Sequence, residues 1–138
     1  MIRLLSIAVL ILVGSRLEAK AAELVFTYWG SPFERHAVKK VLQQFNQQHA
    51  NIRVRAQHIP GSNYTTKLVT MVAAGTAPDI AYIPDTMISK WASAGWLIDL
   101  SDHFENDSEA SNRMQQIYYK VQDKIVGANC AIETIILY

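Results

Sequence analysis

Residues 68–100 read LVTMVAAGTAPDIAYIPDTMISKWASAGWLIDL and predict a helix, a turn, a buried strand, a polar loop and a second helix. The first helix ends at Gly75, which suits the left-handed conformation of a helix terminus, and a proline follows it. Residues 80–83 form an apolar run without alternation, which indicates a strand covered on both faces of a mostly parallel sheet. Asp85 or Thr86 then offers the N-cap of the second helix. The loop after such a strand is where open α/β sheets bind ligands.

The residues before this unit predict two more strands and two helices. Residues 23–29 are largely apolar or aromatic and predict the first strand. Ser31 and Glu34 have the spacing of a capping box, and apolar residues at helical spacing after them predict a helix that covers the sheet. Residues 51–59 alternate between apolar and polar side chains, which predicts a half-buried strand near a sheet edge. A further helix is expected to begin near Tyr64.

The residues after this unit carry weaker signals. Residues 101–112 are polar and acidic, and they predict a short turn or loop. A helix is expected next, with four residues on one face: Met114, Ile117, Tyr118 and Val121. Residues 124–129 and 131–138 predict two short strands. The final run stops among apolar residues with no turn or cap, so we expect the chain to be cut inside an element.

The first 22 residues have the pattern of a secretory signal peptide. Arg3 supplies a positive start, residues 4–13 form an apolar core, and Ala19-Lys20-Ala21 fits a cleavage site. This stretch is too short for a membrane anchor, since a spanning helix needs about 20 apolar residues. The only cysteine, Cys130, lies far from the signal and reads as a small buried hydrophobe. We therefore expect periplasmic release without a lipid anchor, with residues 23–138 as the mature domain.

Composition narrows the function further. The 138 residues carry 13 basic and 12 acidic side chains, a balance that gives no electrostatic footprint for nucleic acid or for an anionic membrane. The four histidines show no metal-ligand spacing. Neither a nucleophile elbow nor a phosphate-binding glycine loop occurs in the sequence. The sequence predicts a protein that is not an enzyme and that holds no metal and no cofactor.

Residues 73–101, AAGTAPDIAYIPDTMISKWASAGWLIDLS, resemble a segment of the extracellular solute-binding proteins of ABC transporters, of the sugar-binding type that includes the maltose-binding protein. Gly75, Pro78 and Asp79 stand in the Gly-x-x-Pro-Asp positions of that family. Residues 95–100 supply its closing Gly-x-Leu-x-Asp-Leu. The agreement in order and spacing extends over both helix ends, the strand and the loop.

The resemblance implies a two-lobed α/β fold with a ligand between the lobes, of which residues 23–138 would supply an incomplete first lobe. It also implies a periplasmic component of an importer, which captures a carbohydrate and delivers it to the permease subunits, and we expect a monomer. Two alternatives stay open. One is a secreted α/β enzyme acting on a small polar substrate, and the other is a non-functional fragment of a binding protein.

The resemblance places four candidate ligand-binding residues along the cleft. Trp29 would stack on a sugar ring or pack in the core, and Ser31 would bind hydroxyl groups or only cap a helix. Asp85 would accept hydrogen bonds from hydroxyl groups or merely cap the following helix. Glu133 places a carboxylate inside an apolar strand, where burial without a partner is costly, and this favours a role in binding.

Overall fold

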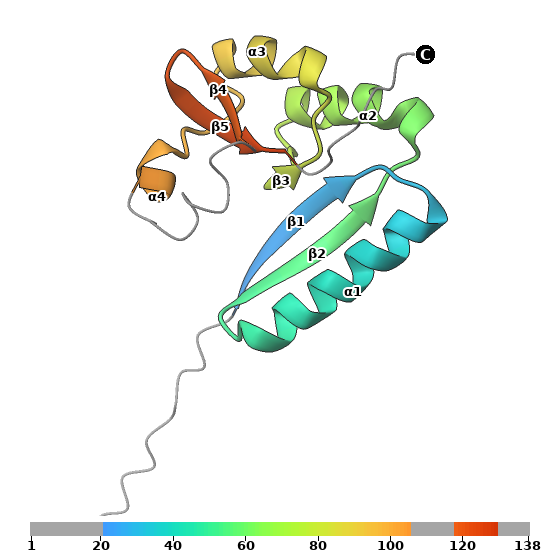
Figure 1. The fold of residues 1–138 in the computed structure, drawn as a ribbon. Coiled ribbons are helices and arrows are strands. Elements are labelled where there is room, and N and C mark those ends of the chain that lie inside the picture. Colours follow the sequence, from blue (N-terminus) through green and yellow to red (C-terminus); the bar gives the residue numbers. More distant parts are fainter. Residues whose placement is uncertain (1–20, 106–117, 130–138) are drawn as a thin grey trace, which may run out of the picture. The chain divides into compact units, whose positions relative to one another are not determined.

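The computed structural model describes residues 21–105 and 118–129, and these residues fall into two units (Figure 1). The first unit ends at Ala81 and the second begins at Tyr82. The first unit contains β1 (Ala22–Tyr28), α1 (Pro32–Gln48), β2 (Ile52–His58), α2 (Gly61–Ala73) and β3 (Ile80–Ala81). The second contains α3 (Asp85–Ser93), α4 (Ser101–Glu105), β4 (Tyr118–Val121) and β5 (Lys124–Ala128).

The sheet of the first unit is parallel and has the strand order β2-β1-β3. Phe26, in the central strand, lies between Ala56 of β2 and Ile80 of β3. Helices connect these strands, so the α/β class and the parallel sheet predicted from the sequence are confirmed. The strand order changes direction at β1, and such a switch point is where open α/β sheets bind ligands beyond the carboxyl ends of their strands.

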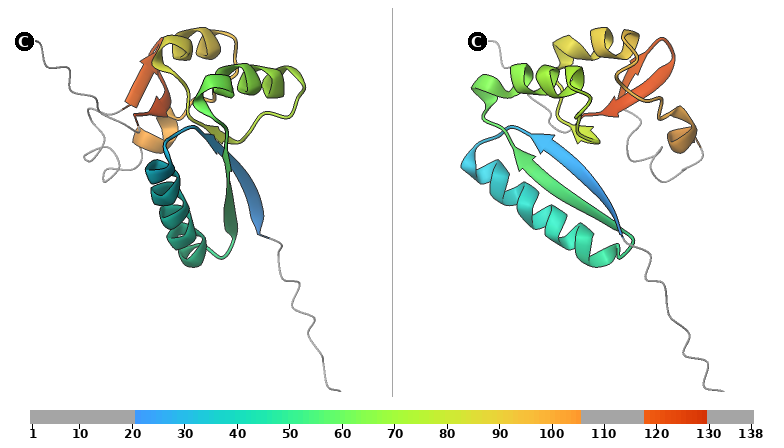
Figure 2. Two further views of the ribbon diagram at one scale, coloured as in Figure 1. Left: turned by 90° about the vertical axis from the view of Figure 1, so that its right-hand side faces the viewer. Right: turned by 180° about the vertical axis from the view of Figure 1, so that it is seen from behind.

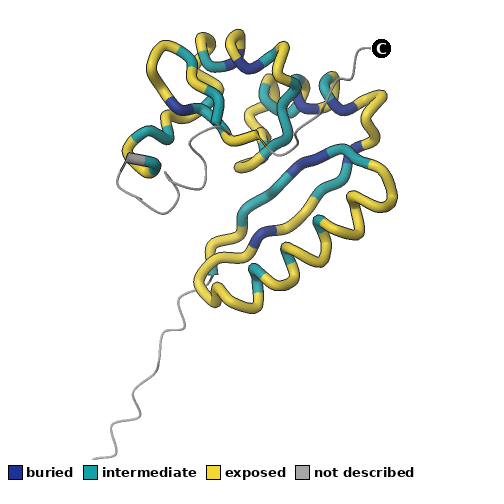
Figure 3. The backbone as a smooth tube through the Cα atoms, in the orientation of Figure 1, coloured by how far each residue is buried: buried dark blue, intermediate teal, exposed yellow. Residues whose placement is uncertain are grey.

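Burial in the first unit increases toward the carboxyl end of β1 (Figure 3). Thr27 is completely buried and Tyr28 nearly so, whereas the start of the strand is exposed. The α2 side chains of Tyr64 and Leu68 are also buried. The Tyr64 hydroxyl group donates a hydrogen bond of 3.0 Å to the Thr27 carbonyl oxygen, which ties the start of α2 to the end of β1.

Helix α1 runs alongside β2 in both views of Figure 2. The Asn46 side chain bonds to the outer edge of β2, where it accepts from the Val54 N–H at 2.8 Å and donates to the Val54 carbonyl at 2.9 Å. Among the described residues β2 pairs only with β1, which confirms that residues 51–59 contain an edge strand. The side-chain amide of Asn46 therefore hydrogen-bonds two backbone groups of Val54 that no described strand pairs with at this edge.

Strand β3 differs from the expectation of a strand buried on both faces at residues 80–83. It has only two residues, and the side chain of Ile80 is 46% exposed. Among the described strands β3 pairs only with β1, so it lies at an edge of this sheet. The Asp79 carboxylate, just before β3, accepts a hydrogen bond of 2.8 Å from the Val25 N–H of β1.

Both ends of α2 follow from local backbone geometry. The helix begins at Gly61 instead of near Tyr64, because extended Pro60 is the N-cap and its carbonyl accepts from the Asn63 N–H at 3.0 Å. Gly75 follows the helix with a φ of +69°, so the predicted left-handed terminus is confirmed.

The second unit contains three departures from the sequence-based expectations. Pro84 is the N-cap of α3, so the prediction that Asp85 or Thr86 caps this helix is wrong. Helix α4 occupies the start of the expected loop at residues 101–112, because the Leu100 carbonyl accepts from the amides that begin it.

The expected helical face that included Tyr118 and Val121 is also wrong, because both residues lie in β4. This strand forms an antiparallel hairpin with β5, and its turn consists of Gln122 and Asp123 at φ values of 51° and 65°. Two successive left-handed residues define a type I′ turn, whose twist matches that of paired strands. Pairing with β5 within this hairpin thus overrides the helical spacing of the two apolar residues.

Asp99 and Ser101 fasten the hairpin to the segment before it. The Asp99 carboxylate accepts from both the Ser101 hydroxyl, at 2.6 Å, and the Ser101 N–H, at 3.0 Å. The Ser101 hydroxyl oxygen accepts from the Ile125 N–H at 3.0 Å, and the Ile125 carbonyl accepts from the Leu100 N–H at 2.7 Å. The Ser101 side chain, followed by the Ser101 backbone, holds the pKa of Asp99 below its usual value.

Several predictions concern residues outside the described part of the chain. These are the signal peptide, the helical residues Met114 and Ile117, the burial of Cys130 and the strand at residues 131–138. Within residues 21–105 and 118–129, no helix is both long and apolar enough to cross a membrane.

Candidate functional site

The loop of residues 29–31 leaves the central strand at its buried carboxyl end. Trp29 is half-buried, and its ring contacts the ring of Tyr64 edge-on, with 4.7 Å between centroids. Tyr64 is only 2% exposed and is itself fixed to Thr27, so the indole rests on a rigid support. The two interpretations of Trp29 therefore both have a structural basis. Part of the ring packs against Tyr64, and part stays accessible to a ligand.

Ser31 forms the predicted capping box at the start of α1. Its hydroxyl oxygen accepts from the Glu34 N–H at 3.3 Å, while the Glu34 carboxylate accepts from the Ser31 N–H at 2.7 Å. The backbone N–H of Ser31, and then its hydroxyl group, lower the pKa of Glu34 from its ordinary value of 4.5. The hydroxyl proton of Ser31 is not used by the box, so this exposed residue can still donate to a ligand.

Phe33 adds two features that the sequence did not single out. Its side chain is 84% exposed, which is unusual for a large apolar residue. Its amide belongs to the first turn of α1, and it has no hydrogen-bond partner among the described residues. The loop and the first turn of α1 together present one free N–H, one hydroxyl group and two aromatic rings. These are the groups that recognise the hydroxyl edge and the apolar face of a sugar.

His58, at the end of the neighbouring strand β2, contacts Gly30 of this loop. The His58 Nε2 lies 3.1 Å from the Gly30 carbonyl oxygen, and the His58 ring meets the Tyr28 ring edge-on at 5.4 Å. A Cβ on Gly30 would lie 3.0 Å from the Cβ of Glu34, so a larger residue would push the capping side chain away. Sequence reasoning missed His58 because it was tested only for metal spacing. Its position at the end of a strand parallel to β1 was the available signal.

Asp85 lies in the second unit and is the first residue of α3. Its side chain is exposed, and its Oδ1 accepts a hydrogen bond of 2.7 Å from the Thr86 N–H. A carboxylate at the first turn of a helix is stabilised there by the exposed amides. The Oδ2 makes no hydrogen bond with any described residue, so it remains available to hydroxyl groups of a ligand.

The structure therefore places Trp29 and Ser31 in one loop of the first unit and Asp85 at a helix start of the second. Glu133 lies outside the described residues. In the described parts of the chain, no group of three or more histidine, cysteine or acidic side chains is placed to hold a metal ion.

Comparison with known proteins supplies the family. Residues 27–123 match the bacterial extracellular solute-binding protein family, and this match includes residues of both described units. No curated protein gives a significant sequence match.

Three solved structures are similar to this chain. An ABC substrate-binding protein from Listeria monocytogenes, in complex with cycloalternan, is 28% identical with a TM-score of 0.66 over 75% of this chain and 27% of its own. An extracellular solute-binding protein family 1 member from Alicyclobacillus acidocaldarius is 30% identical with a TM-score of 0.56 over 59% of this chain and 21% of its own. A periplasmic oligogalacturonide-binding protein from Yersinia enterocolitica, in complex with saturated digalacturonic acid, is 25% identical with a TM-score of 0.63 over 75% of this chain and 26% of its own.

The chain thus spans about a quarter of the length of these solved relatives, and its fold corresponds to part of one of their lobes. The family match covers well over half of the chain and includes the Pro-Asp strand and the closing Asp-Leu segment quoted above. The chain therefore belongs to the bacterial extracellular solute-binding proteins.

Proposed function

We propose that this chain supplies one wall of a carbohydrate site in the substrate-binding component of an ABC importer, and that this component delivers its sugar to the permease subunits. The observation that carries the proposal is the family match together with the loop at residues 29–31 and the first turn of α1, which present aromatic rings and hydrogen-bond donors at a switch point of a parallel sheet. Two of the similar proteins were solved with saccharides, which supports a sugar as the ligand class.

The four proposed binding residues have different roles. Trp29 would stack on the apolar face of a sugar ring, and the hydroxyl group of Ser31 would donate to a ring substituent. Asp85 and Glu133 would accept hydrogen bonds from hydroxyl groups, and each charge-assisted bond contributes about 1.5–3 kcal/mol. A site with one wall leaves much of the ligand hydrated, so we expect weak binding from this chain alone and tighter binding when a second lobe is present.

The test is a heteronuclear NMR titration of the chain with maltotriose, cycloalternan and digalacturonate, because chemical shifts detect millimolar affinities. The expected result is a saturable change of the Trp29 indole signal and of the Phe33 amide signal with one saccharide. Trp96, which is 47% exposed in the second unit, is the internal control for nonspecific contact with an exposed indole. Equal changes at Trp29 and Trp96, or none with any saccharide, would count against a sugar site in this loop.

We further propose that residues 1–22 are removed during export and that the mature chain begins at Ala22 or Glu23. Amino-terminal sequencing of the protein recovered from a periplasmic fraction tests this proposal. Recovery of the unprocessed Met1 form from that fraction would contradict it.

A further inference from the structure

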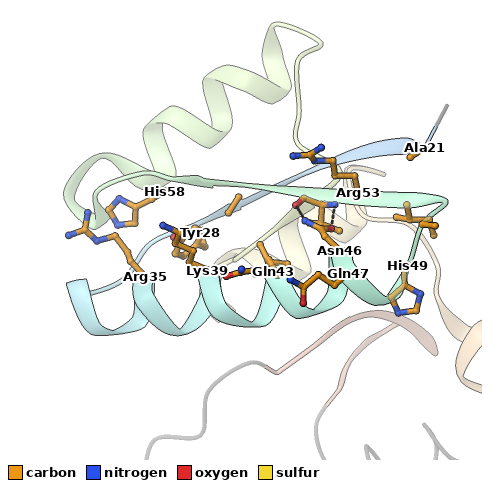
Figure 4. A pocket seen from close by; sticks show the side chains of 15 residues that line it. Ala21, Tyr28, Arg35, Lys39, Gln43, Asn46, Gln47, His49, Arg53 and His58 are labelled. Carbon is orange, nitrogen blue, oxygen red and sulfur yellow. Dashed lines mark hydrogen bonds between the residues drawn. The ribbon is translucent and has the colours of Figure 1, made fainter.

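A groove of about 850 Å³ lies between α1 and β2 of the first unit (Figure 4). One wall is the polar row of α1 that includes Arg35, Lys39 and Gln43, and the other is the strand from Ile52 to His58. None of the 15 residues that line the groove is an aspartate or a glutamate. The groove therefore carries positive charge and hydrogen-bond donors without a matching carboxylate.

Arg35 and Lys39 lie one helical turn apart, and Figure 4 shows them gathered with His58 at one end of the groove. Neither cation forms an ion pair with a residue in the described part of the chain. The neighbouring Glu34 carboxylate does not neutralise them by an ion pair, since it is held by the Ser31 N–H. Both charges are thus open to an anion that enters the groove.

The outer edge of β2 follows the same groove. Val54 directs its N–H and C=O outward, where the Asn46 side chain binds them. Residues two apart in a parallel strand turn their backbone groups to the same side, so Ala56 also points its N–H and C=O outward. Ala56 is exposed and lines the groove. Asn46 therefore blocks the edge at one residue and leaves a short open stretch beside the cations.

We propose that this groove binds an extended acidic segment of a partner polypeptide. The segment pairs with the edge of β2 at Ala56 and places its carboxylates on Arg35 and Lys39. A saccharide fits less well, because the aromatic ring in the lining, that of Tyr28, is only 5% exposed and offers no open face. A membrane surface fits less well, because these cations line a concave groove. This surface is additional to the sugar site proposed for residues 29–31.

The test is a fluorescence anisotropy titration of the full chain with a fluorescein-labelled peptide of alternating glutamate and threonine, at low ionic strength. The expected result is saturable binding that weakens as salt is added. Arg35→Gln and Lys39→Gln should each weaken the affinity about threefold to fivefold, the upper part of the range for a single exposed ion pair. The matched control is Lys40→Gln, which removes a neighbouring exposed charge that does not line the groove and should leave the affinity unchanged.

A separate variant tests whether the peptide pairs with the backbone of β2 at Ala56. Ala56→Pro removes an outward N–H, and proline is tolerated at such an edge position, so the affinity should fall about fivefold, the equivalent of one hydrogen bond. A melting temperature equal to that of the parent chain shows that the variant is folded. A peptide N-methylated at alternate residues, tested on the unaltered chain, should lose affinity to the same degree.

Several outcomes would overturn the proposal. These are an absence of binding, an equal loss of affinity in Lys40→Gln, and full retention of affinity by the N-methylated peptide. Polygalacturonate and vesicles of phosphatidylglycerol and phosphatidylcholine serve as competitors. Displacement of the peptide by either of them at lower anion concentration than by unlabelled peptide would assign the groove to a polysaccharide or to a lipid surface.

Discussion

Replacing Tyr64 by phenylalanine removes one oxygen atom from the support beneath the candidate sugar loop. The phenol group donates its only proton to the Thr27 carbonyl at 3.0 Å, so the 3.2 Å contact with the Thr27 hydroxyl must be donated by Thr27. Thr27 is fully buried and Tyr64 is 2% exposed, so water cannot replace the lost oxygen. The Tyr64→Phe variant leaves the buried Thr27 hydroxyl without this acceptor and removes one hydrogen bond from the Thr27 carbonyl.

The cost follows from those two groups. The buried hydroxyl donor without an acceptor costs about 1–3 kcal/mol and the lost bond to the carbonyl about 1 kcal/mol, so we expect the free energy of unfolding to fall by about 2–4 kcal/mol. With a urea dependence of about 2 kcal/mol per molar, the unfolding midpoint should fall by about 1–2 M. Circular dichroism during a urea titration measures this change. The indole NMR signal of Trp29 reports the same event locally, because its ring packs on that of Tyr64.

Two further variants make the test specific. Tyr119→Phe is the matched control, because the Tyr119 hydroxyl makes no hydrogen bond with a described residue, and its effect should stay within about 0.5 kcal/mol. Thr27→Val combined with Tyr64→Phe removes the stranded hydroxyl donor, so the pair should cost less than the sum of the single variants. Strict additivity, or a Tyr64→Phe midpoint equal to that of the parent chain, would refute the reasoning.

Two other predictions concern the capping box of α1 and the turn between β4 and β5. Glu34→Gln should destabilise the chain at neutral pH. Because the pKa of Glu34 is lowered in the folded chain, the difference in stability between variant and parent should be full above the ordinary value of 4.5. It should vanish as the pH falls through the lowered folded pKa. Thermal melts from pH 7 down to pH 3 measure this, and a difference that stays constant with pH would show that the carboxylate charge has no part in the capping box. Asp123→Gly should stabilise the β4–β5 hairpin by about 1 kcal/mol, because Asp123 has a φ of 65° that glycine adopts without strain. Amide hydrogen exchange of β5 measures the gain, Asp123→Ala should show a loss instead, and equal protection in both variants would contradict this account of the turn.

The candidate site was only partly accessible from the sequence. Ser31 and Glu34 were found because a capping box joins residues three apart, and the structure confirms both of its hydrogen bonds. Asp85 was correctly placed at a helix start, but its role as N-cap was wrong, because Pro84 already has the extended backbone that a cap requires. The Phe33 exposure was not predicted, since the same residue type at that spacing is compatible with a buried face.

The sequence by itself determined the elements whose backbone is satisfied by near neighbours. Gly75 ends α2, the Ser31 box begins α1, and alternation in residues 51–59 marks an edge strand, because each signal acts within one turn or one strand. The identity of the family was readable for the same reason, since its motif is one continuous segment of 29 residues at positions 73–101.

Only the tertiary structure decided which distant groups meet. Tyr64 reaches Thr27 across 37 residues, and Asp79 reaches the backbone of Val25 across 54. No spacing rule specifies such contacts, because they depend on which strands become neighbours and on which backbone groups the sheet leaves unpaired. The assignment of Tyr118 to a strand was decided within one hairpin, since pairing with β5 outweighed a local pattern that suited a helix equally well.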